Sequence, residues 1–191
     1  MSNERPEKSL LSLWLLLALC AAPVVASYVA YYFWQPSGHV NYGELIEPRP
    51  LPDARFTLAD GALFSWHKLK GKWVLAIVDS GNCDAYCQSK LLYMRQARLA
   101  QGKEMDRIER VWLIADDAKP AASTVAEYQG TWLIRAAGSE FLKLFPAQRA
   151  PADHIYIIDP LGNLMMRFPR DADPQKMVKD IARLLRTSGI G

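Results

Sequence analysis

Two of the three cysteines in the chain, Cys83 and Cys87, stand in the stretch "DSGNCDAYCQSK" with three residues between them. On a helix, residues four apart share one face, with Cβ atoms about 6 Å from each other. That spacing is close to the reach of a disulfide, and it also suits two soft thiolates on one copper(I) ion. A bridge across so short a loop stabilises the folded state little. The spacing therefore favours functional thiols over a purely structural cross-link.

The segments on either side predict where these thiols lie. The run "KWVLAIVD", residues 72–79, is continuously apolar and rich in β-branched residues, which is typical of a strand buried on both faces. Residues 84–102 repeat Cys87, Leu91 and Met94 at helical spacing, and Gly102 ends the repeat. Cys83 would thus precede a helix N-terminus, whose free N–H groups lower the pKa of a nearby thiol. We expect Cys83 to be the more reactive cysteine.

The remaining periodic segments alternate between strand and helix patterns, which predicts an α/β fold with a central sheet and helices on both faces. The C-terminal helix has Asp173 as N-cap and Pro174 at its first position. We expect one domain over residues 54–189, preceded by a Pro/Gly-rich linker at 35–53. The expected elements are a hairpin at 55–66, strands at 110–117, 131–136 and in 154–168, and helices at 121–130, 139–145 and 173–189.

The front of the chain indicates a membrane anchor. Residues 10–34 are apolar, and no Asp, Glu, Lys or Arg occurs from Ser9 to Gly43. A bilayer core of about 30 Å needs about 20 apolar residues in a helix. A cleaved signal peptide and a lipoprotein cysteine at Cys20 are the alternatives. The apolar run continues past the "VVAS" site, and Leu19 precedes Cys20 where a small residue is expected.

We therefore expect an uncleaved transmembrane helix at residues 10–34 after a cytoplasmic tail at residues 1–9. Arg5 and Lys8 in the tail favour the tail inside and the domain outside. In a bacterium this means a single-pass inner-membrane protein with a periplasmic domain. There the thiols would form a structural disulfide, a redox pair or a metal site. The net charge of +3 and the scattered basic residues argue against nucleic acid as a partner.

Longer stretches resemble a known family. "FTLADGALFSWHKLKGKWVLAIVDSGNCDAYC" is similar to the front half of a thioredoxin-like domain. Three residues between the cysteines, at this distance from "GK", resemble the Sco family of copper proteins, which assemble cytochrome c oxidase. "RVWLIADDAKPAASTVAEY" and "YIIDPLGNL" continue the similarity. The whole chain, anchor included, most resembles the small Sco-like membrane proteins of proteobacterial cytochrome oxidase operons.

The resemblance implies a copper site made of both cysteines and one downstream histidine. Cys83 and Cys87 match the family's cysteines, whereas the position of its histidine falls on Pro151. His154 lies three residues later, and on a strand this odd offset turns a side chain to the opposite face. The family's proline after the first cysteine is replaced by Asp84. We therefore expect copper at Cys83 and Cys87, with His154 as the candidate third ligand.

The expected function is that of a membrane-anchored assembly factor that delivers copper(I) to cytochrome c oxidase, and so a copper chaperone rather than an enzyme. The partner would be the oxidase subunit that carries a copper site, or another assembly factor. One alternative is a thiol-disulfide oxidoreductase without metal, in which Cys83 attacks a partner disulfide and Cys87 resolves the product. The other is a non-catalytic docking factor whose cysteines rest as a disulfide. His39 and His67 are expected to be solvated.

Overall fold

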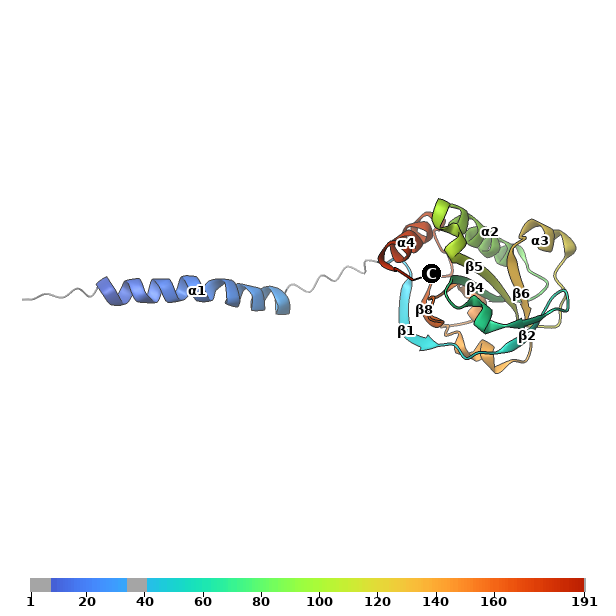
Figure 1. The fold of residues 1–191 in the computed structure, drawn as a ribbon, viewed down its shortest axis with the longest axis horizontal. Helices are drawn as coiled ribbons and strands as arrows, with labels where there is room; N and C mark the ends of the chain where they lie inside the picture. The colour runs from blue at the N-terminus through green and yellow to red at the C-terminus, as the bar shows by residue number, and fades with distance from the viewer. Residues whose placement is uncertain (1–7, 34–40, 191) are drawn as a thin grey trace, which may run out of the picture. The chain divides into compact units, whose positions relative to one another are not determined.

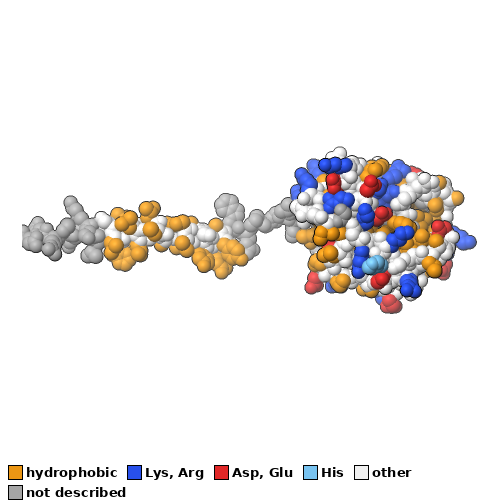
Figure 2. Space-filling view, viewed as in Figure 1, with side chains coloured by type: hydrophobic (Ala, Val, Ile, Leu, Met, Phe, Trp, Pro, Cys, Tyr) orange, Lys and Arg blue, Asp and Glu red, His pale blue; other side chains and the backbone are white. Residues whose placement is uncertain are grey.

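The structure is a computed structural model that describes residues 8–33 and 41–190, and it divides into two compact units, Met1–Val40 and Asn41–Gly191. The first unit contains helix α1, Lys8–Phe33, with Pro23 inside it. Its stretch Leu11–Phe33 has a mean hydropathy of 2.1 and is long enough to cross a membrane. On the face drawn in Figure 2, hydrophobic side chains run along this helix and no charged side chain is seen on its described residues. The expected anchor is thus present as a helix, although Trp34 lies outside the described residues.

The second unit is built on one mixed sheet of eight strands in the order β1-β8-β7-β4-β5-β6-β2-β3 (Figure 1). The central strands β4, β5 and β6 are parallel, and β7 pairs with β4 in the antiparallel sense. The strands are β1 Glu44–Pro50, β2 Arg55–Leu58, β3 Leu63–Ser65, β4 Trp73–Asp79, β5 Ile108–Ile114, β6 Thr131–Arg135, β7 Tyr156–Ile158 and β8 Asn163–Arg167.

Local capping sets where the two long helices of this unit begin. The Asp84 side chain accepts a hydrogen bond from the backbone N–H of Cys87 at the start of α2. The Asp173 side chain accepts from Gln175 and Lys176 at the start of α4, as the sequence predicts. The α-helices are α2 Ala85–Leu99, α3 Ala122–Glu127 and α4 Pro174–Thr187, and the 3₁₀ helices are η1 Trp66–Leu69, η2 Gly102–Arg107, η3 Glu140–Leu144 and η4 Pro151–Asp153.

The sheet separates two cores, which confirms the predicted thioredoxin-like α/β architecture. One core lies under α2 and α4 and contains Leu91 and Ile181. The other lies under η1 and η3 and is mainly aromatic, with Phe56, Trp66 and Phe141 in mutual ring contact. The second face is therefore covered by 3₁₀ rather than α-helices. The helix expected at 139–145 is η3, a single short 3₁₀ element.

The predicted linker is too long at its C-terminal end. Residues 44–50 form the edge strand β1, which pairs with β8, so the folded unit begins near residue 41 rather than at 54. Pro48 and Pro50 are compatible with a strand here because one side of an edge strand makes no ladder hydrogen bonds. A two-pronged ion pair between Arg167 and Glu44 holds β1 to β8, at 2.8 and 2.9 Å.

Candidate functional site

Cys83 and Cys87 form a disulfide at the carboxyl end of β4, with their Cα atoms 5.0 Å apart. Cys83 lies in the loop before α2 and Cys87 in the first turn of that helix. Cys83 is 5% exposed and Cys87 is fully buried. Cys83 is also the one non-glycine residue among those described with a positive φ, +22°. The predicted pair is therefore brought together, with Cys83 nearer the surface.

The first turn of α2 is held by the residues around the cysteines. The backbone N–H of Cys87 donates to the Asp84 carboxylate at 2.8 Å. The side-chain amide of Gln88 donates to the Cys83 carbonyl at 3.1 Å. Asp84, which stands where the resemblance leads us to expect proline, therefore works as the N-cap.

The loop from β4 to Cys83 packs directly against the loop that follows β5. The Gly81 N–H donates to the Asp116 carboxylate at 2.9 Å. A Cβ atom on Gly81 would lie 2.0 Å from the carbonyl oxygen of Ala118. Hydrogen bonds from the Ser80 side chain and the Gly81 N–H lower the pKa of Asp116. Asp116 therefore ties the two loops together.

A buried ion pair lies one turn beyond Cys87. The Lys90 ammonium is 2.5 Å from the Asp79 carboxylate at the end of β4, and it also donates to the carbonyl of Ala152. The Lys90 side chain is 3% exposed and that of Asp79 is 14% exposed. Burial lowers the pKa of Lys90, and its hydrogen bond to Asp79 opposes this shift. This pair is not predicted from the sequence. Its one signal is that Lys90 is three residues from Cys87 and so shares its buried face.

Tyr86, between the two cysteines, makes a second connection to the segment around residue 153. Its hydroxyl is within hydrogen-bonding distance of the carbonyl oxygens of Asp153 at 2.9 Å and Arg170 at 2.7 Å. Burial raises the pKa of Tyr86 to about 12, so the hydroxyl stays a donor at neutral pH. The start of α2 is therefore attached through two side chains, Tyr86 and Lys90, to the segment that leads into β7.

His154 follows this segment, but its ring turns away from the thiols. Its Nδ1 donates to the carbonyl of Phe168 at 2.8 Å, and its ring lies 5.9 Å from that of Tyr156. Ile155 belongs to the core that contains both cysteines, and Tyr156 belongs to the opposite core. Because side chains alternate along extended backbone, His154 is on the Tyr156 side of the sheet.

Among the described residues, Cys83 and Cys87 are the candidate copper ligands that the structure brings together. Within residues 8–33 and 41–190, no group of three or more His, Cys, Asp or Glu side chains is placed to hold a metal ion. The ligand role of His154 stays a prediction. His67 is exposed near Asp53, away from the site, and His39 lies outside the described residues.

The fold and the disulfide define a thioredoxin-like domain with a CxxxC pair, which follows in the chain a helix able to span a membrane. A family model described as "transmembrane-like, thioredoxin-like, C-terminal domain" matches residues 73–188. This match covers more than half of the chain, and the protein belongs to that family. A comparison with curated protein sequences finds no match.

Solved structures with this fold include copper proteins and thiol enzymes. ScoI from Bradyrhizobium japonicum with copper bound is 18% identical with a TM-score of 0.54, covering 71% of this chain and 99% of ScoI. Yeast Sco1 with copper bound is 16% identical with a TM-score of 0.59, and the match covers 73% of this chain and 96% of yeast Sco1. A putative protein disulfide isomerase from Bacteroides thetaiotaomicron is 15% identical with a TM-score of 0.53, and the match covers 76% of this chain and 89% of the isomerase. At these identities the similarity shows a shared fold.

Proposed function

We propose that this protein is a membrane-anchored thiol-disulfide exchange factor that reduces cysteines at the copper centre of cytochrome c oxidase during its assembly. The observation that carries the proposal is the Cys83–Cys87 disulfide at the start of α2, without a third metal ligand beside it among the described residues. The resemblance to Sco-like proteins of oxidase operons supports the choice of partner. Copper delivery is the function expected from the sequence, and the orientation of His154 favours exchange instead.

The exchange begins from the dithiol form, which an external dithiol reductant must supply. The Cys83 thiolate attacks one sulfur of the partner's disulfide, and the partner's other sulfur leaves as a thiolate and takes up a proton. The Cys87 thiol loses its proton and attacks the Cys83 sulfur, which releases the second partner thiol. The partner gains two electrons and two protons, and this chain returns to the disulfide form seen here.

The surroundings of the pair suit this sequence. Cys83 is the less buried sulfur and precedes the helix, so a partner reaches it first. Cys87 is fully buried, so it is kept from external disulfides and is available to resolve the mixed disulfide. The bonds from Lys90 and Tyr86 to neighbouring segments hold α2 in place while the sulfur–sulfur bond opens and closes.

Copper(I) delivery is the second candidate. Two relatives in fold are copper-bound Sco proteins, and two cysteines with Cα atoms 5.0 Å apart can place both thiolates on one copper(I) ion after reduction. Such a site would be two-coordinate unless His154 turned to it or the partner supplied a ligand. The copper here is cargo that passes to the partner.

A copper(I) competition experiment separates the two candidates. The reduced full-length protein, in neutral detergent without oxygen, is titrated against a copper(I) chelator of known affinity, beside Cys87→Ser and His154→Ala. The exchange function predicts weak copper(I) retention that His154→Ala leaves unchanged. Tight binding of one copper(I) ion that weakens in His154→Ala would establish delivery as the main function.

A further inference from the structure

A buried arginine lies far along the sheet from the disulfide loop. Arg110 in β5 is only 5% exposed. Figure 2 shows other Lys and Arg side chains on the surface, interspersed with Asp and Glu. Its Nη2 donates to the carbonyl of Gln129 at 2.6 Å. Its Nε and Nη1 are buried and have no hydrogen-bond partner among the described residues. Native proteins contain few such groups, because leaving one unpaired costs about 1–3 kcal/mol or more.

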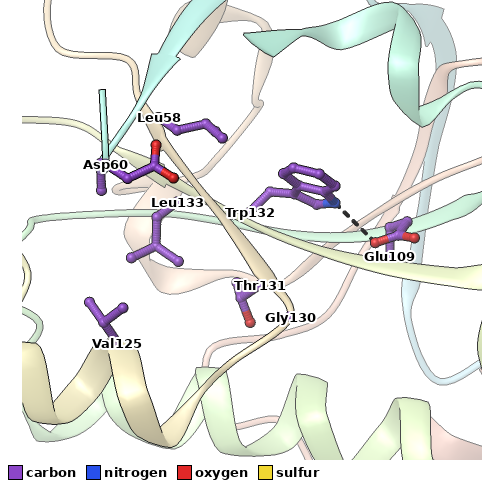
Figure 3. A pocket seen from close by; sticks show the side chains of 9 residues that line it. Leu58, Asp60, Glu109, Val125, Gly130, Thr131, Trp132 and Leu133 are labelled. Carbon is purple, nitrogen blue, oxygen red and sulfur yellow. Dashed lines mark hydrogen bonds between the residues drawn. The ribbon is translucent and has the colours of Figure 1, made fainter. Parts of the chain in front are cut away.

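Two further donors without partners occupy neighbouring positions on the same face of the sheet. Thr131 in β6 is the register partner of Arg110, and its buried hydroxyl has no partner among the described residues. In Figure 3 this hydroxyl points from β6 toward the helical layer, away from the Trp132 ring. Trp112, two residues further along β5, has a buried indole N–H that also lacks a hydrogen-bond partner among the described residues. All three side chains offer hydrogens, and only the Thr131 hydroxyl can also accept one.

The charges around Arg110 leave its positive charge uncompensated. Burial, and then the charges of Arg98 and Arg95 on α2, lower the pKa of Arg110. Arg98 is paired with Asp106 at 3.1 Å, and Arg95 donates to the carbonyl of Glu127. Among the described residues, the acid that raises this pKa is Glu109, which projects from the opposite face of β5 and accepts from the Trp132 indole at 3.0 Å. The region is therefore positive and rich in donors.

We propose that the domain binds one small inorganic anion of chloride size between β5, β6 and α2, held by Arg110 Nε and Nη1 and by the Thr131 hydroxyl. An anion only accepts hydrogen bonds and neutralises the buried charge. A water molecule must also donate, and of these side chains only the Thr131 hydroxyl could accept from it, whereas an anion uses every donor. Gly130 leaves room for the guanidinium, since a Cβ atom there would lie 3.3 Å from Arg110 Nη2.

The route for the anion is the open pocket drawn in Figure 3. This pocket has a volume of about 370 Å³ and is lined by Gly130 and Thr131, the residues next to Arg110. It brings solvent to the first residue of β6, which is the register partner of Arg110. The site is separate from the cysteines, and the inference does not depend on the proposed function.

Thermal unfolding of the full-length protein in neutral detergent tests the proposal. Chloride replaces gluconate at constant ionic strength, because gluconate is too large for the site. We expect a saturable rise in Tm, since a ligand that binds only the folded state stabilises it. Arg110→Met should abolish the rise. At the lowest chloride concentration this variant should be at least as stable as the parent, because it lacks the buried charge of Arg110. The control Arg135→Met, at an exposed position of β6, should keep the rise.

Thr131→Val keeps the shape of the side chain and removes one donor. It should raise the half-saturating chloride concentration about fivefold, which corresponds to the loss of one hydrogen bond. Should Arg110→Met fail to fold, the broadening of the chloride-35 NMR line by the parent and by Thr131→Val gives the same comparison. Identical Tm values in chloride and gluconate for the parent, or an unchanged chloride response in Arg110→Met or Thr131→Val, would overturn the proposal.

Discussion

The two cysteines have different surroundings, and their reactivities should differ accordingly. In the reduced full-length protein, Cys83 should be alkylated faster than Cys87 at neutral pH. Cys83 is nearer the surface and precedes α2, whereas Cys87 is fully buried beside Leu91. Mass spectrometry of peptides after timed alkylation measures both rates in one sample. If Cys87 is labelled first, the roles of attacking and resolving cysteine are reversed.

The Lys90–Asp79 pair should contribute strongly to stability only while both members are present. Lys90→Met leaves the Asp79 carboxylate buried without its counter-ion and should cost about 3–5 kcal/mol in the free energy of unfolding. The double variant Asp79→Asn, Lys90→Met should recover much of that loss. Urea unfolding followed by tryptophan fluorescence measures the free energy of unfolding of each variant.

Lys143→Met is the matched control, because Lys143 and Glu140 form an exposed pair whose loss should change stability by less than about 1 kcal/mol. Equal effects of Lys90→Met and Lys143→Met would show that the buried pair is not a special element of the site.

At the residue scale, the sequence predicts the sulfur pair well and its surroundings poorly. Cys83 and Cys87 are predicted as a pair by their short spacing at the start of a helix, although Cys83 lies in the loop before α2 and only Cys87 lies in the helix. The partner groups of Lys90 and Tyr86 come from residues 152, 153 and 170, which only the tertiary fold brings near α2. The odd offset of His154 from the family's histidine position predicts a side chain on the opposite face of the sheet. In this structure the His154 ring donates to the carbonyl of Phe168.

Between elements, the contact of the β4–α2 loop with the β5–α3 loop should be intolerant of added volume. Gly81→Ala places a methyl group against the Ala118 carbonyl, so one of the two loops must move. We expect a loss of about 1–3 kcal/mol in stability and slower exchange at Cys83. Gly189→Ala is the control, since no atom lies within 4 Å of its added Cβ. Unchanged stability and exchange in Gly81→Ala would show that the loop contact does not position Cys83.

Elements with strong periodicity or caps were predicted, and those without were not. The strand after Lys72, the helix after Asp84 and the helix after Asp173 all occur as expected. β1 was missed because its prolines and exposed residues give no alternation, and its pairing with β8 depends on residues more than 100 positions away. η3 was predicted as a longer helix because its apolar residues have helical spacing over fewer than two turns.

For the whole molecule, the anchor should remain in the mature protein. The apolar stretch of α1 spans 23 residues, which matches the hydrocarbon core of a bilayer. Intact mass of the protein from washed membranes should include residues 10–33, and alkaline carbonate should not release it. A mature chain that starts near Ser27 or at Cys20 would contradict the anchor. Orientation with the domain in the periplasm is a separate prediction, which protease protection of sealed vesicles measures.

Trapping a mixed disulfide tests the proposed function most directly. The full-length Cys87→Ser protein, with Cys83 reduced, is mixed with a copper-centre subunit of cytochrome c oxidase whose cysteines are oxidised. We predict a one-to-one covalent complex through Cys83, which dithiothreitol releases and which Cys83→Ser does not form. The unsubstituted dithiol protein should reduce the subunit and return to the Cys83–Cys87 disulfide. Absence of the covalent complex, together with transfer of copper(I) from the unsubstituted protein to the reduced subunit, would contradict exchange and establish copper delivery instead.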